Sequence, residues 1–461
     1  MTETETNQEE VVSTVQMLNL MESVAAAGQP AAAQGFVPAV PETIAEAGLP
    51  DSSIEQLILK HLHFREEMVG RELSDALGLK FSVIDKVLDN MKRHHLVQVK
   101  GSLGWGAVSS VFSLPEAGRI RARDCLDRNQ YCGPAPVPLD QYRDAVRAQR
   151  LRSGWLTRQS LQDAFRHMVV SPEIVAKVGP AVNSGKSFLI YGQPGNGKTY
   201  LAEALFKVES SHIYVPHALE YQGTIVRLFD PVYHHLVSED SPSANSISAD
   251  RTHDGRWALC RRPFIVSGGE LTMAMLDLSF NAISKIYDAP FQLKANNGIY
   301  LIDDFGRQQV TPAEVLNRWI VPMDRRVDYL TFNTGSKIEV PFETFLIFST
   351  NLRPEQFGDE AFLRRLEYKM LLRSPDDKEF AEIFSRVCVK KGMECSPAQI
   401  HRFIETHYLK TGKRFRRCQP GDTISHAIDL INFEQASPCL TDDVLDRAFE
   451  SCFVHADGID D

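Results

Sequence analysis

Residues 188–199 read FLIYGQPGNGKT, in which four apolar residues run into a segment that fits the pattern G-x-x-x-x-G-K-[ST]. Residues 200–209 (YLAEALFKVE) follow with apolar residues at helical spacing. A phosphate-binding loop requires this order of strand, glycine-rich loop and helix. Glycines let the backbone approach a polyphosphate closely, and the helix presents the positive end of its dipole to the anion. The stretch therefore predicts a nucleotide site.

The residue types in this loop predict individual roles. We expect Lys198 to bridge the β and γ phosphates and the Thr199 hydroxyl to bind Mg²⁺. A chance match in a glycine-bearing turn is the alternative, and the flanking strand and helix argue against it. The predicted nucleotide-binding residues are Gly192, Gln193, Pro194, Gly195, Asn196, Gly197, Lys198, Thr199 and Tyr200.

A second apolar run, residues 299–302 (IYLI), ends in the carboxylates Asp303 and Asp304. This is the form of a Walker B strand, whose terminal acid holds the Mg²⁺ of a nucleotide. We therefore expect Asp303 to be the metal residue and Asp304 to polarise the attacking water, a position where many such enzymes carry glutamate. A strand that ends in a solvated acidic turn is the alternative.

Two further segments predict catalytic residues. Residues 344–350 (TFLIFST) form a third apolar run, and the Asn351 that follows fits a residue that orients water and senses the γ phosphate. Residues 359–366 (DEAFLRRL) predict a helix that presents Arg364 and Arg365. An arginine that reaches the γ phosphate of a neighbouring subunit would stabilise the charge of the transition state, whereas the alternative is a surface ion pair.

Together these motifs resemble those of an AAA+ ATPase. Residues 327–342 (VDYLTFNTGSKIEVPF) predict a hairpin just before the third apolar run, which resembles an insertion of the MoxR-like branch. The runs FQLKANNGIYLIDDFGRQ, NRWIVPMDRRVDYLTF and FSTNLRPEQF are similar to bacterial predicted ATPases with chaperone activity associated with Flp pilus assembly. The resemblance covers roughly residues 45–453.

This resemblance implies ATP and Mg²⁺ as cofactors and a homo-oligomeric ring, by analogy a hexamer, that remodels a protein client. It favours Arg365 over Arg364 as the arginine finger. Gly421 stands where the family places a second sensor arginine, so we expect Arg416 or Arg417 to substitute, or that function to be missing.

The chain predicts an α/β fold with a P-loop AAA+ αβα core, a C-terminal helical lid and an N-terminal winged helix. Its 461 residues suffice for several domains. We expect residues 1–49 to form a disordered arm. Within 131–160, a proline-rich linker (132–139) marks a boundary and a helical preamble begins, with residues 142–166 helical. The predicted domains are 1–49 (arm), 50–130 (winged helix), 131–160 (linker and preamble), 161–372 (core) and 373–456 (lid).

The prediction of a winged helix depends on helical segments at 53–62, 69–77, 81–95 and 116–128 and on a β-prone hairpin at 96–99 and 108–114. Lys86, Lys92 and Arg93 on the third helix would suit DNA. Asp85 and Asp89 on the same helix favour a protein-docking module instead, because a DNA reader concentrates positive charge on one face.

Composition limits the remaining possibilities. The net charge of −10 provides no overall basic field for nucleic acid or an anionic membrane. The eight cysteines include no C-x-x-C and predict free thiols. We see no leader and no run near the roughly 20 apolar residues of a membrane span, so we expect a cytoplasmic protein without membrane insertion. The alternatives to a chaperone-like ATPase are a DNA-bound regulatory ATPase and a nucleotide-dependent scaffold with little turnover.

Overall fold

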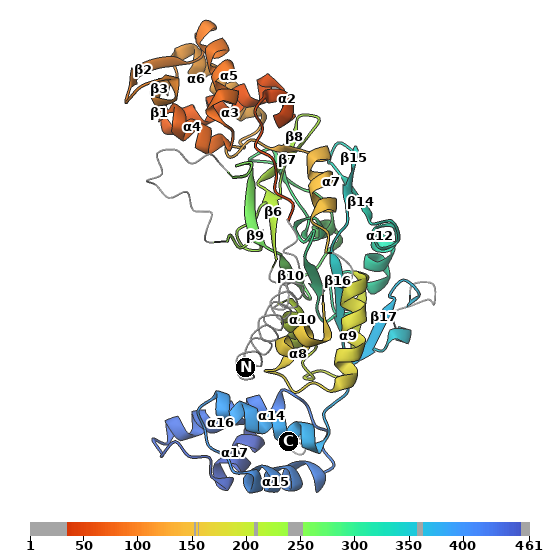
Figure 1. Cartoon of the computed structure of the whole chain (residues 1–461). Coiled ribbons are helices and arrows are strands. Elements are labelled where there is room, and N and C mark those ends of the chain that lie inside the picture. The colour runs from red at the N-terminus through yellow and green to blue at the C-terminus, as the bar shows by residue number, and fades with distance from the viewer. Residues whose placement is uncertain are drawn as a thin grey trace, which may run out of the picture. The chain divides into compact units, whose positions relative to one another are not determined.

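The computed structural model describes residues 35–151, 154, 156–206, 211–237, 252–356 and 363–452 (Figure 1). The chain divides into residues 1–37 and a compact second unit, residues 38–461. Most of the predicted arm, residues 1–34, lies outside the described residues, as do residues 359–362 of the helix predicted before Arg364. The second unit contains all the elements below.

A five-stranded parallel sheet forms the centre of this unit. Its strands lie in the order β10 (Phe264–Ser267), β13 (Ile299–Ile302), β16 (Phe345–Thr350), β5 (Phe188–Tyr191) and β17 (Tyr368–Leu371). Every neighbouring pair is parallel, so all five carboxyl ends meet at one edge. All six residues of β16 are buried, as expected for an inner strand covered on both faces. The three apolar runs predicted as strands are thereby confirmed.

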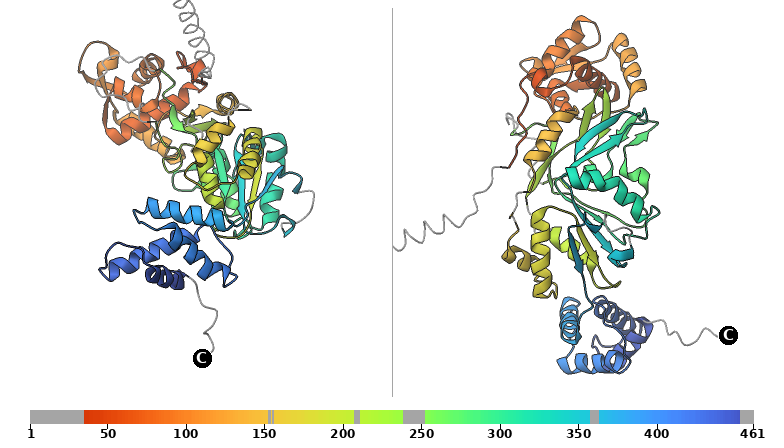
Figure 2. Two further views of the ribbon diagram at one scale, coloured as in Figure 1. Left: turned by 60° about the horizontal axis from the view of Figure 1, so that its bottom comes forward. Right: turned by 90° about the vertical axis from the view of Figure 1, so that its right-hand side faces the viewer.

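Helices cover both faces of this sheet (Figure 2). Residues of α8 (Arg158–Phe165), α9 (Pro172–Ser184) and α10 (Lys198–Phe206) form one hydrophobic core with Phe188, Ile190 and Ile347. On the other face α12 (Pro312–Arg325) buries Trp319 against Tyr300, Phe342 and Phe348. The fold is therefore mixed α/β with a parallel sheet between helical layers.

The linker and preamble predictions were partly wrong. Residues 137–138, predicted as linker, form strand β4 (Val137–Pro138) at the edge of a second sheet, and Val137 is fully buried. A proline is tolerated there because an edge strand does not need every N–H. The predicted helix 142–166 is two helices, α7 (Leu139–Ala148) and α8, with Gly154 at positive φ between them.

The second sheet has the order β11 (Ser279–Asn281), β12 (Ile286–Asp288), β8 (Thr224–Arg227), β7 (Ala218–Tyr221), β4. Gln222 and Gly223 join β7 to β8, and both have positive φ, as a tight hairpin turn requires. Two antiparallel pairs stand apart from it: β6 (His212–Pro216) with β9 (Trp257–Arg261), and β14 (Val327–Thr331) with β15 (Lys337–Pro341). The second pair confirms the hairpin predicted for residues 327–342. Short helices are η3 (Met273–Leu276), α11 (Phe291–Lys294) and η4 (Pro354–Gln356).

Residues 44–128 contain the predicted helices and hairpin. The elements are α2 (Ile44–Ala47), α3 (Asp51–Arg65), β1 (Glu67–Val69), α4 (Gly70–Leu77), α5 (Phe81–Arg93), β2 (Gln98–Ser102), η1 (Ala107–Ser109), β3 (Ser110–Ser113) and α6 (Glu116–Arg128). The prediction of a disordered arm over residues 1–49 was wrong at its end, because α2 forms there and Ala47 and Leu49 are buried in the core of this unit. The short strand β1 was not predicted; it completes an antiparallel sheet of order β1-β3-β2.

The C-terminal residues 376–452 form a helical unit with its own core. Its elements are α14 (Asp377–Lys390), α15 (Pro397–Ile404), the π-helical turn η5 (Glu405–Leu409), α16 (Gln419–Phe433) and α17 (Asp442–Cys452). Phe380, Phe384, Phe403, Tyr408 and Phe449 pack together at its centre. All eight cysteines are free, as predicted. Within the described residues, no helix combines the length and apolarity needed to cross a membrane.

Candidate functional site

The glycine-rich loop lies between β5 and α10, at the carboxyl edge of the parallel sheet. The Gly192 N–H donates to the carbonyl oxygen of Thr350 on the neighbouring strand (3.2 Å). Gly192 has φ +148°, and a Cβ there would lie 2.4 Å from the Leu372 oxygen. Gly195 has φ +77°, and a Cβ there would lie 2.7 Å from Cys418 Sγ. Both positions therefore require glycine.

Lys198 is held at the centre of this loop. Its Nζ donates to the carbonyl oxygens of Gly192 (3.1 Å) and Gln193 (3.3 Å) and to Asn351 Oδ1 (2.6 Å). Burial lowers the pKa of the Lys198 ammonium, against an opposing effect of Asp304 and Asp303. The predicted sensor residue and the loop lysine are therefore direct neighbours.

The two carboxylates after β13 face the same loop. Thr199 Oγ1 donates to Asp303 Oδ2 (2.6 Å), and Asn351 Nδ2 donates to Asp304 Oδ1 (3.0 Å). Asp304 has a left-handed backbone (φ +48°), and its N–H donates to Asp303 Oδ1 (3.0 Å). Left-handed backbone is uncommon outside glycine and is found at functional sites more often than elsewhere. Hard oxygen donors from Thr199 and Asp303 fit a divalent cation such as Mg²⁺.

A cavity of about 660 Å³ opens onto these groups. Of the predicted residues, Pro194 to Tyr200, Asp303, Asp304 and Asn351 line it, while Gly192 and Gln193 line another cavity. Tyr200 is 40% exposed and its ring meets His167 edge-on, with 5.6 Å between ring centroids. The structure thus brings together the loop, both carboxylates and the asparagine, as predicted.

Sequence reasoning missed a second wall of this cavity. His167, Met168 and Val169 precede α9, and Ile383, Val387 and Lys390 lie on α14. Neither segment carries a recognisable motif. Arg386 on α14 donates to the carbonyl oxygens of Arg166 and Met168, so the two segments meet through contacts more than 200 residues apart in sequence, which periodicity does not reveal.

The C-terminal unit contacts the loop directly. The Cys418 N–H donates to the Gly195 carbonyl oxygen (2.9 Å). Arg416 donates to Ser374 Oγ (2.7 Å) and to Gln193 Oε1 (3.5 Å). Arg417 lines the cavity, where it donates to the Val169 carbonyl oxygen (2.6 Å) and pairs with Glu379 (2.7 Å). Both candidates for the missing sensor arginine therefore lie beside the loop.

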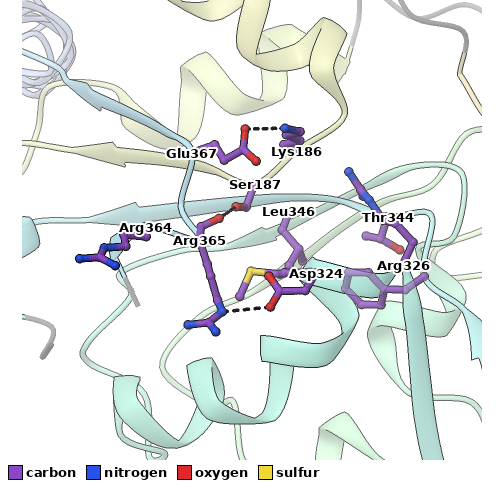
Figure 3. A pocket seen from close by; sticks show the side chains of 11 residues that line it. Lys186, Ser187, Asp324, Arg326, Thr344, Leu346, Arg364, Arg365 and Glu367 are labelled. Atoms are coloured by element: carbon purple, nitrogen blue, oxygen red, sulfur yellow. Dashed lines mark hydrogen bonds and ion pairs between the residues drawn. The ribbon is translucent and has the colours of Figure 1, made fainter. Parts of the chain in front are cut away.

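Arg364 and Arg365 do not reach this cavity. They line a separate one of about 620 Å³ at the amino ends of β5 and β16, together with Lys186, Arg326 and Glu367 (Figure 3). Arg365 Nε donates to Asp324 Oδ2 (3.2 Å), and the Arg365 carbonyl oxygen accepts from Ser187 Oγ (2.9 Å). Within one chain, the two arginines are therefore not part of the loop site.

One family model matches a part of this chain. Residues 376–451, which form the C-terminal unit, match a family described as a domain of unknown function, DUF8689. No curated protein matches the chain. Among solved structures, NtrX from Brucella abortus is similar at 12% identity and a TM-score of 0.37, over 82% of this chain. The chain spans 64% of the length of that structure.

Proposed function

We propose that this protein is a Mg²⁺-dependent ATPase of AAA+ type, with a P-loop αβα core, the C-terminal unit as lid and residues 50–130 as a winged helix. One observation carries the proposal. The glycine-rich loop, Asp303, Asp304 and Asn351 come from three separate parts of the chain and converge on a single cavity. A structural turn would not require this convergence of a lysine, two carboxylates and an amide.

Nucleotide binding would replace the hydrogen bonds that Lys198 now makes within the protein by contacts to the phosphates. The buried Lys198 ammonium is now satisfied by two loop carbonyls and Asn351. A triphosphate offers it stronger, charge-assisted acceptors, so Lys198 would turn to the β and γ phosphates and release Asn351. The backbone amides at the start of α10 face the same anion.

Thr199 and Asp303 would hold Mg²⁺, because their oxygens already lie 2.6 Å apart at the end of the loop. When bound, the ion neutralises charge on the phosphates. Asp304 then accepts the proton of the attacking water, and Asn351, once released by Lys198, orients that water. The hydrogen bond between Asn351 and Asp304 couples these two roles.

Arg365 would act on a neighbouring copy. Its distance from its own loop site and its place at an open cavity support a role in trans. A head-to-tail interface of this kind closes into a ring, which by resemblance is a hexamer. Hydrolysis would then change the contacts between subunits in the cytoplasm and remodel a protein client.

The first test is ATP binding and hydrolysis by the full-length protein. Lys198→Ala should weaken ATP binding at least about a hundredfold, because a charge-assisted contact to the phosphates is lost. Lys186→Ala is the matched control, since Lys186 pairs with Glu367 at the other end of the sheet. Equal ATP affinity in the parent and in Lys198→Ala would overturn the site.

The second test separates binding from chemistry. Asp304→Ala should leave ATP affinity within a few fold and reduce turnover by about a hundredfold or more, because the water loses its base. Clear phosphate release by the parent would dispose of the scaffold alternative. The DNA alternative is less favoured because Asp89 pairs with Lys92 on α5 (2.6 Å). Salt-dependent DNA binding by the full chain would revive it.

A further inference from the structure

A second cavity, of about 870 Å³, adjoins the proposed nucleotide site. Gly192 and Gln193 line it from the loop, and Leu372 and Arg373 line it from the end of β17. Asn196 and Asn351 line both cavities. The two spaces therefore meet at the loop, at the end where the γ phosphate would lie.

Lys198 and Asn351 form the partition between these cavities. The ammonium donates to the carbonyl oxygens of Gly192 and Gln193, which belong to the second cavity, and to Asn351, which belongs to both. In the proposed reaction Lys198 contacts the γ phosphate and Asn351 orients the water that attacks it. Cleavage would therefore produce orthophosphate against this partition.

The charges in the second cavity suit an anion. Arg353 and Arg373 line it against one acid, Glu355. Among the described residues, neither arginine side chain makes an ion pair or a hydrogen bond. Two exposed guanidinium groups with free donors offer phosphate the planar, paired contacts that arginine favours.

One buried atom indicates which anion. Asn196 is 1% exposed, and its Nδ2 donates to the Leu372 carbonyl oxygen (3.4 Å) and to Ser374 Oγ (3.3 Å). Its Oδ1 is buried and has no hydrogen-bond partner among the described residues. A buried acceptor without a donor is costly. Orthophosphate at neutral pH keeps one proton and can donate it, whereas the terminal phosphate of ADP is largely deprotonated.

We infer that the second cavity is a product site for orthophosphate. Arg353 and Arg373 bind the dianion, and Asn196 Oδ1 accepts a hydrogen bond from its O–H group. Because bound nucleotide would already have drawn Lys198 away from Asn351, phosphate would reach this site after cleavage and would leave without passing the bound ADP. The inference rests on the proposed function, because it identifies the anion as the second product of that site.

The test measures binding of inorganic phosphate to the full-length protein saturated with Mg²⁺ and ADP. Arg353→Gln and Arg373→Gln should each weaken phosphate binding about tenfold, because each removes a charged donor, and should leave ADP affinity within twofold. Arg307→Gln is the control, since Arg307 lines only the first cavity. Unchanged phosphate affinity in both variants, or an equal loss in Arg307→Gln, would overturn the inference.

A second measurement tests the role of Asn196 without mutation. Sulfate matches phosphate in shape and charge but carries no proton at neutral pH. Phosphate should therefore bind about tenfold more tightly than sulfate. Equal affinities would contradict the role of Asn196. If the parent does not hydrolyse ATP, the proposed function is wrong. If the parent hydrolyses ATP but substitution of Arg353 and Arg373 does not change phosphate binding, only this inference is wrong.

Discussion

The two ends of the parallel sheet use similar side chains in different ways. At the carboxyl end, Lys198 and Asn351 pair with each other, and Thr199 pairs with Asp303, beside an open cavity. At the amino end, arginines pair with acids or carbonyls from distant segments. The first arrangement can exchange its hydrogen bonds for a ligand. The second holds the structure together.

Arg262 illustrates the amino end. Its guanidinium donates to Ser211 Oγ (2.8 Å) and to the carbonyl oxygens of Asn297 (2.6 Å) and Gln149 (3.0 Å). The side chain is almost fully buried, so these donors are used within the fold. Arg365 at the same end differs, because its side chain is 30% exposed and that of its ion-pair partner, Asp324, is 49% exposed. Its side chain is therefore less enclosed than that of Arg262.

The largest expected effect tests whether Arg365, unlike Arg262, acts on the loop site of a neighbouring subunit. Arg365→Ala should reduce turnover about a thousandfold, as loss of an arginine finger does, while ATP binding persists. Mixing it with Asp304→Ala should restore activity, because an intact loop site then meets an intact arginine. Random mixing would make about a quarter of the interfaces competent. The measurement is turnover of the mixture against each variant alone.

Two controls sharpen that experiment. Arg364→Ala, mixed in the same way, shows which of the two adjacent arginines acts. A mixture of Asp304→Ala with Lys198→Ala should stay inactive, because both lesions lie in the loop site. If the Arg365→Ala mixture also stays inactive, Arg365 belongs with Arg262 as a structural residue, and the contrast between them fails.

Sequence reasoning placed the carboxyl end better than the amino end, for a physical reason. The loop, Asp303 and Asn351 each directly follow an apolar run, and parallel strands bring such residues to one edge whatever the strand order. The glycine pattern is equally local, because the positive φ values of Gly192 and Gly195 arise within one short loop and favour glycine there.

What could not be predicted depends on long-range packing. His167 and Ile383 meet across the cavity from positions more than 200 residues apart, and no short pattern links them. Strand β4 has only two residues, one of them Pro138, so it offers no alternation of apolar and polar positions. The prolines of residues 132–139 predicted a linker, although Val137 is buried in a sheet.

A stability measurement gives the next effect in size. The Glu343 side chain is 7% exposed and accepts from Arg150 Nε (2.8 Å) in a paired contact that joins α7 to β16. Glu343→Gln should lower the free energy of unfolding by about 2 kcal/mol, because Arg150 and the nearby Arg326 lose their buried counter-charge. Urea unfolding measures this, and ATP affinity should not change.

Glu367→Gln provides the matched comparison. Its ion pair with Lys186 leaves both side chains nearly half exposed, so its loss should cost about 0–1 kcal/mol. Similar losses of unfolding free energy in the two variants would mean that burial does not determine how much an ion pair at the amino end contributes to stability. A change in ATP affinity with either variant would show that the two ends are not independent.

The smallest effect concerns the pH dependence of ATP binding. Burial lowers the pKa of Lys198 from the usual 10.5 in the free protein. The ammonium that attracts phosphate is present below this lowered pKa and is lost as pH rises through it. ATP affinity should therefore be constant near neutral pH and begin to fall at a lower alkaline pH than an exposed lysine would allow.

In Lys198→Arg the guanidinium stays charged, so any remaining affinity should not fall in this range. Equal pH profiles of ATP affinity for the parent and Lys198→Arg would show that the buried lysine does not control binding. The hydrogen bonds of Lys198 at the carboxyl end would then serve the fold, as those of Arg262 do at the amino end.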